Sequence, residues 1–376
     1  MENINLNSTA EAEYNWTANE WNVTSSPSDM ADGSGEEHSA VGRILTAFFL
    51  VVIILCSVTG NSLVCVAVLT QRALRKSSNF FYVSLACSDL LVALAVMTFS
   101  CINDVKGRWI FGKVFCNIWM SLDVMCCTAS ILNICAISFD RYMHIRKPYA
   151  YSDIMTPRRT LLLILGVWLV SALISFIPIH LGLHRQADTE PYDADGNFIC
   201  LIDFNPVYAV GSSLVSFFIP CLIMLFMYIS MYRLAQRHVK SIKQQKQATA
   251  SLGVPQPKSS SDNKASRTLG VIMGVFLVCW TPFFTVNVVT TIYELPEILF
   301  IVATWLGYIN SMANPIIYTI FNKQFRAAFK KLLFLEKCCR GRNSGAPRNG
   351  NALNAQYAPV RRGNSEERRP GQKSAV

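Results

Sequence analysis

The sequence predicts an all-α membrane protein: a seven-transmembrane helix bundle followed by a C-terminal amphipathic helix on the membrane surface. Hydrophobic residues make up 52% of the 376 positions and charged residues only 15%, whereas soluble domains carry about 25% charged residues. The deficit comes from seven apolar runs, each longer than the ~20 residues that a spanning helix needs. The runs are Ile44–Thr70, Phe80–Asn103, Val114–Phe139, Thr160–Leu183, Phe204–Tyr232, Thr268–Tyr293 and Ile298–Asn322.

Only two of these runs contain a charged residue, and each of the two has a single acid, Asp89 or Asp123. Seven buried core helices of a soluble protein would be the alternative, but charge-free runs of this length are typical of membrane spans. Residues 44–320 are therefore expected to form one bundle embedded in the membrane.

Basic residues predict which ends of the helices face the cytoplasm. Residues 1–42 contain no Lys or Arg, and the second, fourth and sixth connections contain only Lys106, Arg108, Lys113 and Arg185. Because cytoplasmic loops carry an excess of Lys and Arg, we expect a multi-pass plasma-membrane protein with its N-terminus outside and its C-terminus inside. The net charge of +10 then faces anionic membrane lipid, and no nucleic acid is expected as a partner.

Residues 1–43 are expected to form a disordered extracellular tail, because they are polar and acidic. They lack the basic and apolar regions of a cleavable signal, so the first helix is expected to direct membrane insertion. Three sequons on the predicted outer side indicate glycosylation at Asn7, Asn15 and Asn22.

Residues 321–335 are expected to form the amphipathic surface helix. Phe325 and Phe329 recur at helical spacing, and basic residues fill the other side. Cys338 and Cys339 follow at a place where palmitoylation would add a second membrane anchor, with unmodified thiols as the alternative.

Residues 336–376 are expected to form a disordered cytoplasmic tail. The chain ends with Ser374 two residues before the aliphatic Val376. A hydroxyl and a terminal carboxylate at this spacing are a pattern that PDZ domains bind, which makes a PDZ-domain protein a candidate partner.

Most of the thirteen cysteines lie inside apolar runs and are expected to be small core residues. Cys116 and Cys200 instead lie on the predicted outer, oxidising side, where we expect them to form a disulfide. Cys126 and Cys127 are adjacent but lack a second His/Cys cluster, so the sequence predicts no metal site.

The third run carries its acid near one end and finishes in Asp140-Arg141-Tyr142. A helix rises ~1.5 Å per residue, so Asp123 and Arg141 lie roughly 27 Å apart, close to the thickness of the hydrocarbon layer. An acid at membrane depth costs at least ~2.5 kcal/mol unless it is paired, and no apolar run contains Lys or Arg. A bound cation is the expected partner of Asp123, and a protonated structural acid is the alternative.

Two further groups of side chains could complete a site for a small cationic molecule. The fifth helix offers hydroxyls that could bind a polar ring or, alternatively, its own backbone carbonyls: Ser212, Ser213 and Ser216. The sixth helix offers a proline that permits a kink, and an aromatic surface that could by itself be core packing: Trp280, Phe283 and Phe284.

A third group of polar residues lies near the middle of three runs: Asp89, Ser130, Asn310, Ser311 and Asn314. Together they could form a hydrated cluster that holds a structural sodium ion, and no other cofactor is expected. A proton-relay channel is the alternative, but no polar path continues from this cluster. We therefore interpret it as a switch element.

These landmarks together resemble the rhodopsin-like (class A) family of G-protein-coupled receptors, over about residues 44–335. Each motif alone is weak evidence, but all of them occur in order along the helices. They are Gly60-Asn61, Leu85-Ala86-Cys87-Ser88-Asp89, Asp140-Arg141-Tyr142, Trp168, Pro220, Phe276 through Pro282, and Asn314-Pro315-Ile316-Ile317-Tyr318 with Phe325. The resemblance implies a cell-surface receptor rather than an enzyme.

Within that family, the segment LDVMCCTAS around Asp123 is similar to the amine-anchoring site of biogenic-amine receptors. Tyr308 occupies the position of the retinal-binding lysine of opsins, which argues against a photoreceptor. The segments SSLVSFFIP, GVIMGVFLVCWTPFF and TWLGYINS are most similar to dopamine receptors of the first, cyclase-stimulating subtype, especially invertebrate ones. Octopamine or tyramine, adrenergic-like and serotonin receptors share most of these residues and stay open as alternatives.

The resemblance implies that a protonated amine pairs with Asp123 while its ring meets the serines of the fifth helix and stacks on Phe283 and Phe284. Cys127 stands where vertebrate members of the subtype usually have Ser, which alters the floor of the site. The implied ligand-binding residues are Asp123, Val124, Cys127, Ser212, Ser213, Ser216, Trp280, Phe283, Phe284, Asn287, Trp305 and Tyr308.

At the cytoplasmic face, the resemblance implies that Arg141 pairs with Asp140 at rest and that Asp262 also engages it. The implied partners are a stimulatory G protein, which raises cyclic AMP through adenylyl cyclase, together with receptor kinases and arrestin. The residues implied in coupling are Asp140, Arg141, Tyr142, Tyr228, Asp262 and Tyr318.

A channel or a transporter is the main alternative of another class. The sequence has no internal repeat, which many transporters have, and no ring of charged residues along a pore. An enzyme is not expected either, because no nucleophile–base pair, metal cluster or phosphate-binding loop is found.

Overall fold

The computed structural model describes residues 33–185, 192, 196, 198–200, 205–250 and 262–333, with side chains for all of these except 33–40, 238–239, 242–250 and 262–269. Several predicted features lie outside the described residues and stay predictions: the sequons at Asn7, Asn15 and Asn22, the cysteines Cys338 and Cys339, and the C-terminal motif at 374–376.

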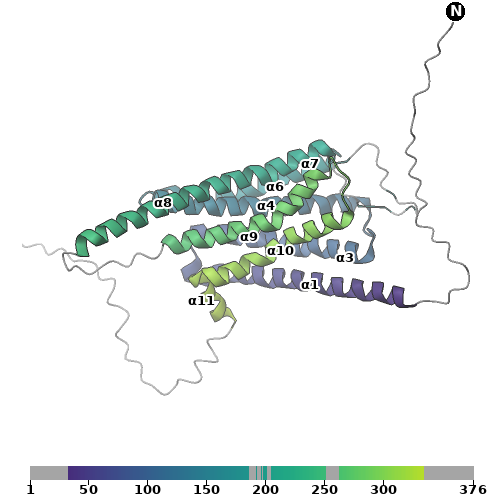
Figure 1. Ribbon diagram of the computed structural model, residues 1–376, viewed down its shortest axis with the longest axis horizontal. Coiled ribbons are helices and arrows are strands. Elements are labelled where there is room, and N and C mark those ends of the chain that lie inside the picture. The colour runs from purple at the N-terminus through teal and green to yellow at the C-terminus, as the bar shows by residue number, and fades with distance from the viewer. Residues whose placement is uncertain are drawn as a thin grey trace, which may run out of the picture.

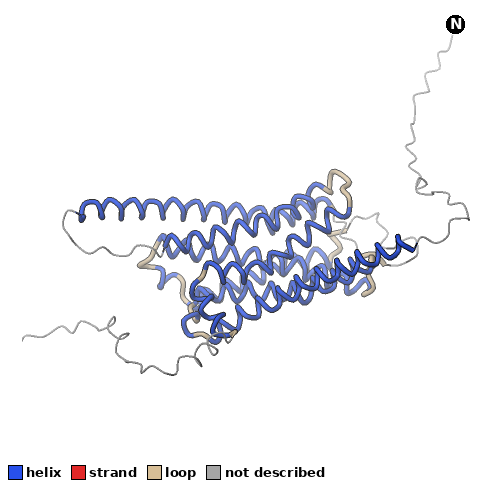
Figure 2. Tube along the Cα trace, turned by 60° about the horizontal axis from the view of Figure 1, so that its bottom comes forward, coloured by secondary structure: helices blue, strands red, loops and turns tan. Residues whose placement is uncertain are grey.

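Long helices that run along one common direction make up the described part of the chain, and no strand forms within it (Figures 1 and 2). Seven helices are long and apolar enough to cross a membrane, which confirms the predicted fold class. The spans are Val41–Thr70, Ser77–Lys106, Gly112–Arg146, Pro157–His180, Pro206–Arg237, Gly270–Val289 and Glu297–Phe321.

Five of the spans lie within single helices: α1 (Gly33–Thr70), α4 (Gly112–Arg146), α6 (Pro157–His180), α9 (Asp262–Val289) and α10 (Glu297–Phe321). The second span joins η2 (Ser77–Asn79), α2 (Phe80–Leu91), η3 (Val92–Met97) and α3 (Thr98–Lys106). The fifth joins α7 (Pro206–Ser213), η4 (Leu214–Phe218) and α8 (Ile219–Ala250). Shorter helices follow the first, third and seventh spans: η1 (Arg72–Leu74), α5 (Tyr151–Ile154) and α11 (Lys323–Leu332).

The segments η3 and η4 are π-helical turns, which widen the helix and leave carbonyls outside its regular hydrogen-bond pattern. At η3, the Trp119 indole N–H donates to the Val96 carbonyl at 3.1 Å, and the Thr98 hydroxyl donates to the Ala93 carbonyl at 3.0 Å. After η4, Pro220 lacks a backbone N–H and loosens the pattern further. These turns help to set which side chains of α3 and α7 face the interior.

The third span, α4, forms the centre of the bundle. It packs against α2, α6 and α8 and also contacts α9. Ser130 and Asn133 in its middle are buried by protein, whereas Leu161, Leu165 and Leu169 of α6 point outward. An outward apolar face of this kind is what a helix needs where it meets lipid. The helix predicted to carry both Asp123 and Arg141 therefore lies against the second, fourth, fifth and sixth spans.

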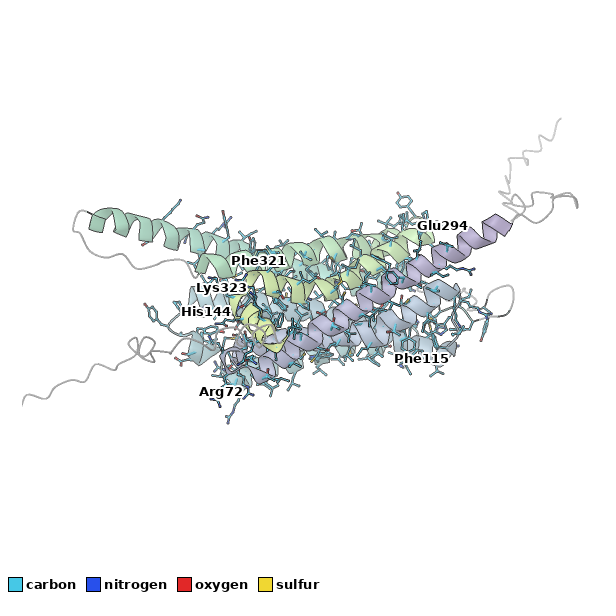
Figure 3. All side chains as sticks on the ribbon, turned by 90° about the horizontal axis from the view of Figure 1, so that it is seen from below. Arg72, Phe115, His144, Glu294, Phe321 and Lys323 are labelled. Carbon is cyan, nitrogen blue, oxygen red and sulfur yellow. A yellow bond between two sulfur atoms is a disulfide. The ribbon has the colours of Figure 1, made fainter. Side chains whose placement is uncertain are left out.

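The two ends of the bundle carry different residues. Figure 3 shows Phe115 at one end and the basic residues Arg72 and Lys323 at the other. We call these the Cys116 end and the Arg141 end, after the residues of α4 that lie near each.

Two glycines let α10 approach its neighbours closely. A Cβ atom added at Gly60 of α1 would lie 2.9 Å from Pro315 of α10, and one added at Gly307 of α10 would lie 2.9 Å from the Trp280 ring of α9. Small residues at helix contacts are typical of membrane bundles, where close packing holds the helices together. These contacts therefore fix α10 against both α1 and α9.

The surface helix α11 begins directly after α10, where Asn322 accepts hydrogen bonds from the backbone N–H groups of Gln324 (3.0 Å) and Phe325 (3.4 Å). Figure 1 shows α11 turning away from the bundle axis. Phe325 is fully buried and packs against Tyr318, with ring centroids 5.5 Å apart. The helix lies inside the predicted range 321–335 but is shorter, because its cap at Asn322 sets its start.

The first helix is longer than its apolar run. It begins at Gly33, inside the range 1–43 that was expected to be an extracellular tail, while the span itself begins at Val41. Residues before the span include Glu and Ala, which favour helix, so the helix extends beyond the hydrophobic segment.

We expect Gly60→Ala to lower the thermal stability of the purified protein, because the added methyl group must displace the Pro315 ring, at a cost of about 1–3 kcal/mol. Gly166→Ala is the matched control, since nothing lies within 4 Å of a Cβ atom there. The measurement is the melting temperature of both variants in detergent. Equal melting temperatures would show that the contact between Gly60 and Pro315 does not constrain the bundle.

Candidate functional site

A cavity lies in the Cys116 half of the bundle, between α4, the α7–η4 segment, α9 and α10. Of the predicted ligand residues, all except Ser213 and Trp305 line it. The cavity is lined by Met120, Asp123, Val124, Cys127, Thr128, Tyr208, Ser212, Ser216, Trp280, Phe283, Phe284, Asn287, Thr304 and Tyr308.

The carboxylate of Asp123 lies in the wall of this cavity. The Tyr308 hydroxyl donates to its Oδ2 at 3.0 Å, and the Cys127 thiol donates to its Oδ1 at 3.2 Å. Within the described residues, no Lys, Arg or His forms an ion pair with it. Two neutral donors orient the carboxylate without neutralising it, so a cation in the cavity would supply the missing charge.

The three serines of the fifth span have different surroundings. Ser213 is fully buried, donates to the Ala209 carbonyl at 2.6 Å and accepts from the Asn287 side chain at 3.0 Å. Ser216 accepts from the Thr128 hydroxyl at 3.2 Å and also lines the cavity. Ser213 thus ties α7 to α9 from behind the cavity wall, unlike the contact with ligand that the resemblance implied.

Ser212 lines the cavity, and its hydroxyl makes one long hydrogen bond within the protein. It donates to the Ala209 carbonyl, but at 3.3 Å. The alternative in which serines bind carbonyls of their own helix therefore holds for Ser212 and Ser213. A ligand hydroxyl could still compete for Ser212, because its present hydrogen bond is long.

Aromatic rings form the wall on the α9 side. Phe284 stacks on Phe217 with ring centroids 4.3 Å apart and an interplanar angle of 9°, and Phe283 meets it edge-on at 5.1 Å. Trp280 packs beside both, at 5.9 Å from Phe283 and 5.8 Å from Phe284. The wall offers ring faces and edges to an aromatic ligand.

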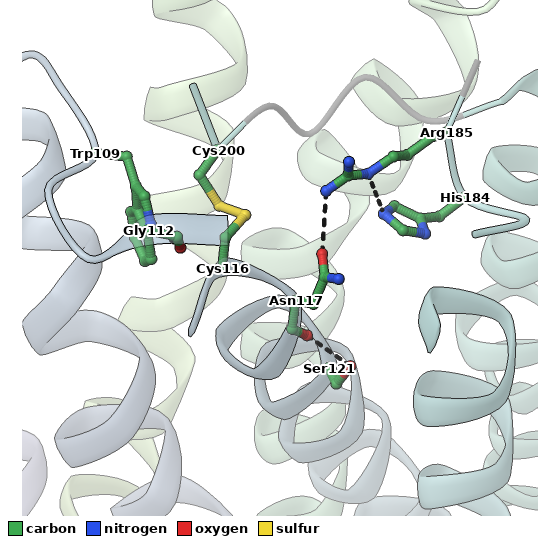
Figure 4. Close-up of a disulfide and its surroundings, with 8 residues drawn as sticks. All are labelled: Trp109, Gly112, Cys116, Asn117, Ser121, His184, Arg185 and Cys200. Carbon is green, nitrogen blue, oxygen red and sulfur yellow. Dashed lines mark hydrogen bonds between the residues drawn. A yellow bond between two sulfur atoms is a disulfide. The ribbon is translucent and has the colours of Figure 1, made fainter. Parts of the chain in front are cut away.

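A disulfide between Cys116 and Cys200 closes the Cys116 end, with a Cα–Cα distance of 5.8 Å, as predicted (Figure 4). Beside it, Arg185 donates to the Asn117 side chain at 3.1 Å and to Nε2 of His184 at 3.2 Å. Burial of His184, together with the charge of Arg185, lowers the pKa of the imidazole below its usual value. The neutral imidazole can therefore accept the hydrogen bond from Arg185.

Trp305 is not among the residues that line the cavity. Its indole N–H donates to Oδ2 of Asp104 on α3 at 2.7 Å. This contact joins α10 to α3 at the Cys116 end. The position of Trp305 thus differs from the direct ligand contact that the resemblance implied.

The polar residues of the middle of the bundle come together around Asp89. Its Oδ1 accepts from Ser130 at 2.8 Å and from Ser311 at 3.0 Å, and its Oδ2 accepts from Asn314 at 2.8 Å. Asn310 belonged to the predicted cluster, but its Nδ2 is buried with no hydrogen-bond partner. Among the described residues, the fully buried carboxylate is held by neutral donors, and a sodium ion at this place stays a prediction.

At the Arg141 end, the Arg141 guanidinium pairs with Oδ2 of Asp140 at 3.1 Å. Tyr151 of α5 donates to the other oxygen of Asp140 at 2.6 Å, a contact that the sequence did not predict. Burial and the bond to Asp140 raise the pKa of Tyr151 above its usual value. Both oxygens of Asp140 are thus engaged.

Three other residues implied in coupling have different surroundings in the structure. The Tyr142 hydroxyl accepts a hydrogen bond from Arg146. Tyr318 is buried and packs edge-on against Tyr82 at 5.0 Å. Asp262 is the first residue of α9, but its side chain is not among those described, so its contact with Arg141 stays a prediction.

Comparison with known proteins shows which family has this architecture. The sequence model of the family described as "7 transmembrane receptor (rhodopsin family)" matches residues 60–318. The chain is 43% identical to Dopamine receptor 1 of Drosophila melanogaster, over 90% of this chain and 72% of that receptor. It belongs to the rhodopsin family of seven-transmembrane receptors. The receptor is also 41% identical to the D(1A) dopamine receptor of Didelphis virginiana (80% of this chain, 76% of that receptor) and 38% identical to Octopamine receptor beta-1R of Drosophila melanogaster (94% and 74%).

Membership of this family confirms the resemblance and identifies a multi-pass membrane receptor rather than an enzyme. The receptor's cavity has further lining residues that the sequence did not single out: Met120, Thr128, Tyr208 and Thr304. Each lies four residues, about one helical turn, from a predicted ligand residue on the same helix. Helical periodicity is the signal that would have found them.

We expect the thermal stability of the receptor to fall between pH 7.5 and pH 5, partly through His184. Its pKa is lowered in the folded state, so the folded protein favours the neutral imidazole. The folded state is stabilised in this way above the usual pKa of about 6.5, and the stabilisation is lost as the pH falls through the folded pKa. His184→Gln should show a smaller fall, because it has no imidazole to protonate. Parallel melting-temperature profiles for His184→Gln and wild type would contradict this assignment.

Proposed function

We propose that this receptor binds a protonated catecholamine, with dopamine as the favoured ligand, and activates a stimulatory G protein and adenylyl cyclase. The observation that carries the proposal is Asp123: a carboxylate in the cavity wall, oriented by Tyr308 and Cys127, without a basic partner among the described residues. An ammonium group is the simplest cation that restores the balance of charge there.

The shape of the cavity supports an aromatic amine. With its ammonium at Asp123, a ligand would direct its ring toward Ser212 and Ser216, against the wall formed by Phe283 and Phe284. A catechol has two adjacent hydroxyls, which suit two serine hydroxyls one helical turn apart. The relatives named as dopamine receptors favour dopamine, at 43% and 41% identity.

Octopamine is the second candidate ligand. The relative named Octopamine receptor beta-1R is 38% identical over a larger share of this chain. Octopamine carries an ammonium group and one ring hydroxyl, so the same anchor at Asp123 would hold it. The two ligands differ in how many hydroxyls they present to the serines.

The proposed signal runs along α4 from Asp123 to Arg141. A ligand changes the balance between two arrangements only through its different affinity for each. We infer that contacts to Ser212 and Ser216 favour an arrangement in which α9 moves outward at the Arg141 end and Arg141 leaves Asp140. The basic residues at the Arg141 end support placing that end in the cytoplasm and the disulfide outside.

Further parts of the proposal rest on sequence patterns, or on the resemblance in the case of receptor kinases and arrestin. They are a sodium ion at Asp89, receptor kinases and arrestin at the cytoplasmic face, a PDZ-domain protein at Ser374 and Val376, glycosylation of the tail and palmitoylation of Cys338 and Cys339. None of them is needed for the binding of an amine.

The decisive test measures cyclic AMP in transfected cells given dopamine, octopamine, serotonin or histamine. Dopamine should give the response at the lowest concentration. Asp123→Asn should weaken that response at least about 100-fold, because removing one partner of a buried charge pair costs about 3–5 kcal/mol. Asp104→Asn is the matched control, since that acid contacts Trp305 outside the cavity. Absence of any response to micromolar dopamine would exclude the favoured ligand.

Substitutions of the two serines should affect ligand binding differently. Ser212→Ala should weaken the binding of dopamine about tenfold, which corresponds to the ~1.4 kcal/mol of one hydrogen bond. It should hardly change the binding of phenethylamine, which has no ring hydroxyl. Ser213→Ala should weaken the binding of both amines to a similar degree, because it removes the hydrogen bond that positions Asn287 in the cavity wall. The measurement is competition binding of both amines to each variant. A selective loss of dopamine in Ser213→Ala would place that hydroxyl on the ligand instead.

A further inference from the structure

Helices α8 and α9 touch at the Arg141 end through a tyrosine that lies on a glycine. A Cβ atom added at Gly270 of α9 would lie 2.7 Å from the hydroxyl oxygen of Tyr228 on α8 and 3.0 Å from two of its ring carbons. Side chains do not approach a Cβ atom so closely. The ring of Tyr228 therefore occupies the volume that a side chain at position 270 would need.

Packing, and not hydrogen bonding, holds Tyr228 in this place. The tyrosine is half-buried, and no hydrogen bond joins its hydroxyl to any described residue. Arg141 meanwhile pairs with Asp140, whose other oxygen binds Tyr151. In this arrangement the hydroxyl of Tyr228 lies at Gly270 of α9 and has no hydrogen-bond partner among the described residues.

Glycine is a poor choice for the interior of a helix unless packing requires it, because it gains less from helix formation than alanine does. Gly270 lies inside α9, where the close contact with Tyr228 supplies such a reason. Gly274 lies one turn further along the same helix, and nothing lies within 4 Å of a Cβ atom there. The two glycines thus differ in this contact while sharing a helix.

We propose that Gly270 is a positioning residue: by lacking a side chain, it holds Tyr228 against α9 in the resting arrangement and so keeps the signalling of the unliganded receptor low. The readout of signalling rests on the proposed function. The contact acts on the separation of α8 and α9, which is the movement that the proposed mechanism requires.

The physical consequence of filling this space is direct. A methyl group at position 270 would push the Tyr228 ring away from α9, which removes the packing that joins the two helices at this level. The resting arrangement loses free energy of packing, while an arrangement with α9 moved outward does not make the contact. The balance between the two arrangements then shifts without any ligand.

The first experiment measures basal cyclic AMP per receptor at the cell surface, without amine, for wild type, Gly270→Ala and Gly274→Ala. We expect Gly270→Ala to raise the basal signal about three- to tenfold. Gly274→Ala adds the same methyl group to the same helix in open space and should leave the signal unchanged. Equal basal signals in the two variants would overturn the proposal.

A second pair of variants tests whether the effect passes through Tyr228. In a Tyr228→Phe background the closest atom, the hydroxyl oxygen, is gone and the nearest contacts are the ring carbons at 3.0 Å. The rise caused by Gly270→Ala should therefore shrink in Tyr228→Phe and vanish in Tyr228→Leu, each compared with its own Gly270 parent. A full rise in the Tyr228→Leu background would overturn the proposal as well.

A third measurement separates this inference from the proposed function and does not depend on an amine or a G protein. Amide hydrogen exchange in the purified receptor should become faster in the α9 turns around Gly270 in Gly270→Ala, relative to Gly274→Ala. If wild type gives no cyclic AMP response to any amine, the proposed function fails, and the exchange rates still decide the role of Gly270. Unchanged exchange around Gly270 would contradict the proposal.

Discussion

The carboxylate of Asp123 is the feature on which the rest of this receptor depends. A charge inside an apolar bundle is tolerated only where other groups compensate it. Tyr308 and Cys127 orient the carboxylate with neutral hydrogen bonds, and the cavity in front of it leaves room for a cation. The aromatic wall and the serines line the rest of the cavity, where they can contact the ring of a bound amine.

The same rule governs the other acids of the third and second spans. Asp89 is satisfied by Ser130, Ser311 and Asn314, and Asp140 pairs with Arg141. The partners of Asp89 come from α4 and α10, and Asp140 pairs with Arg141 of its own helix and with Tyr151 of α5. Each acid therefore lies where separate helices meet. Acids at such junctions make the bundle sensitive to charge, while the glycine contacts of α9 and α10 set how closely the helices approach.

Much of the fold and of the cavity could be predicted from the sequence. Seven apolar runs predicted seven spans, since a helix must satisfy its own backbone in lipid and must reach across it. Asp123 stood out because no basic residue lies in any run. The disulfide between Cys116 and Cys200 followed from the side of the membrane on which both cysteines lie. These are consequences of local composition and length, which the sequence states directly.

Only the tertiary structure decided what each side chain near the cavity touches. Ser212 and Ser213 are neighbours in sequence, yet Ser213 bonds Asn287 behind the wall while Ser212 faces the cavity. Trp305 turns to Asp104, and Tyr228 rests on Gly270. The physical reason is that π-helical turns and close helix contacts rotate each face by amounts that periodicity does not encode. The sequence thus determined the spans and the anchoring acid, and packing between helices determined which hydroxyls, rings and glycines meet.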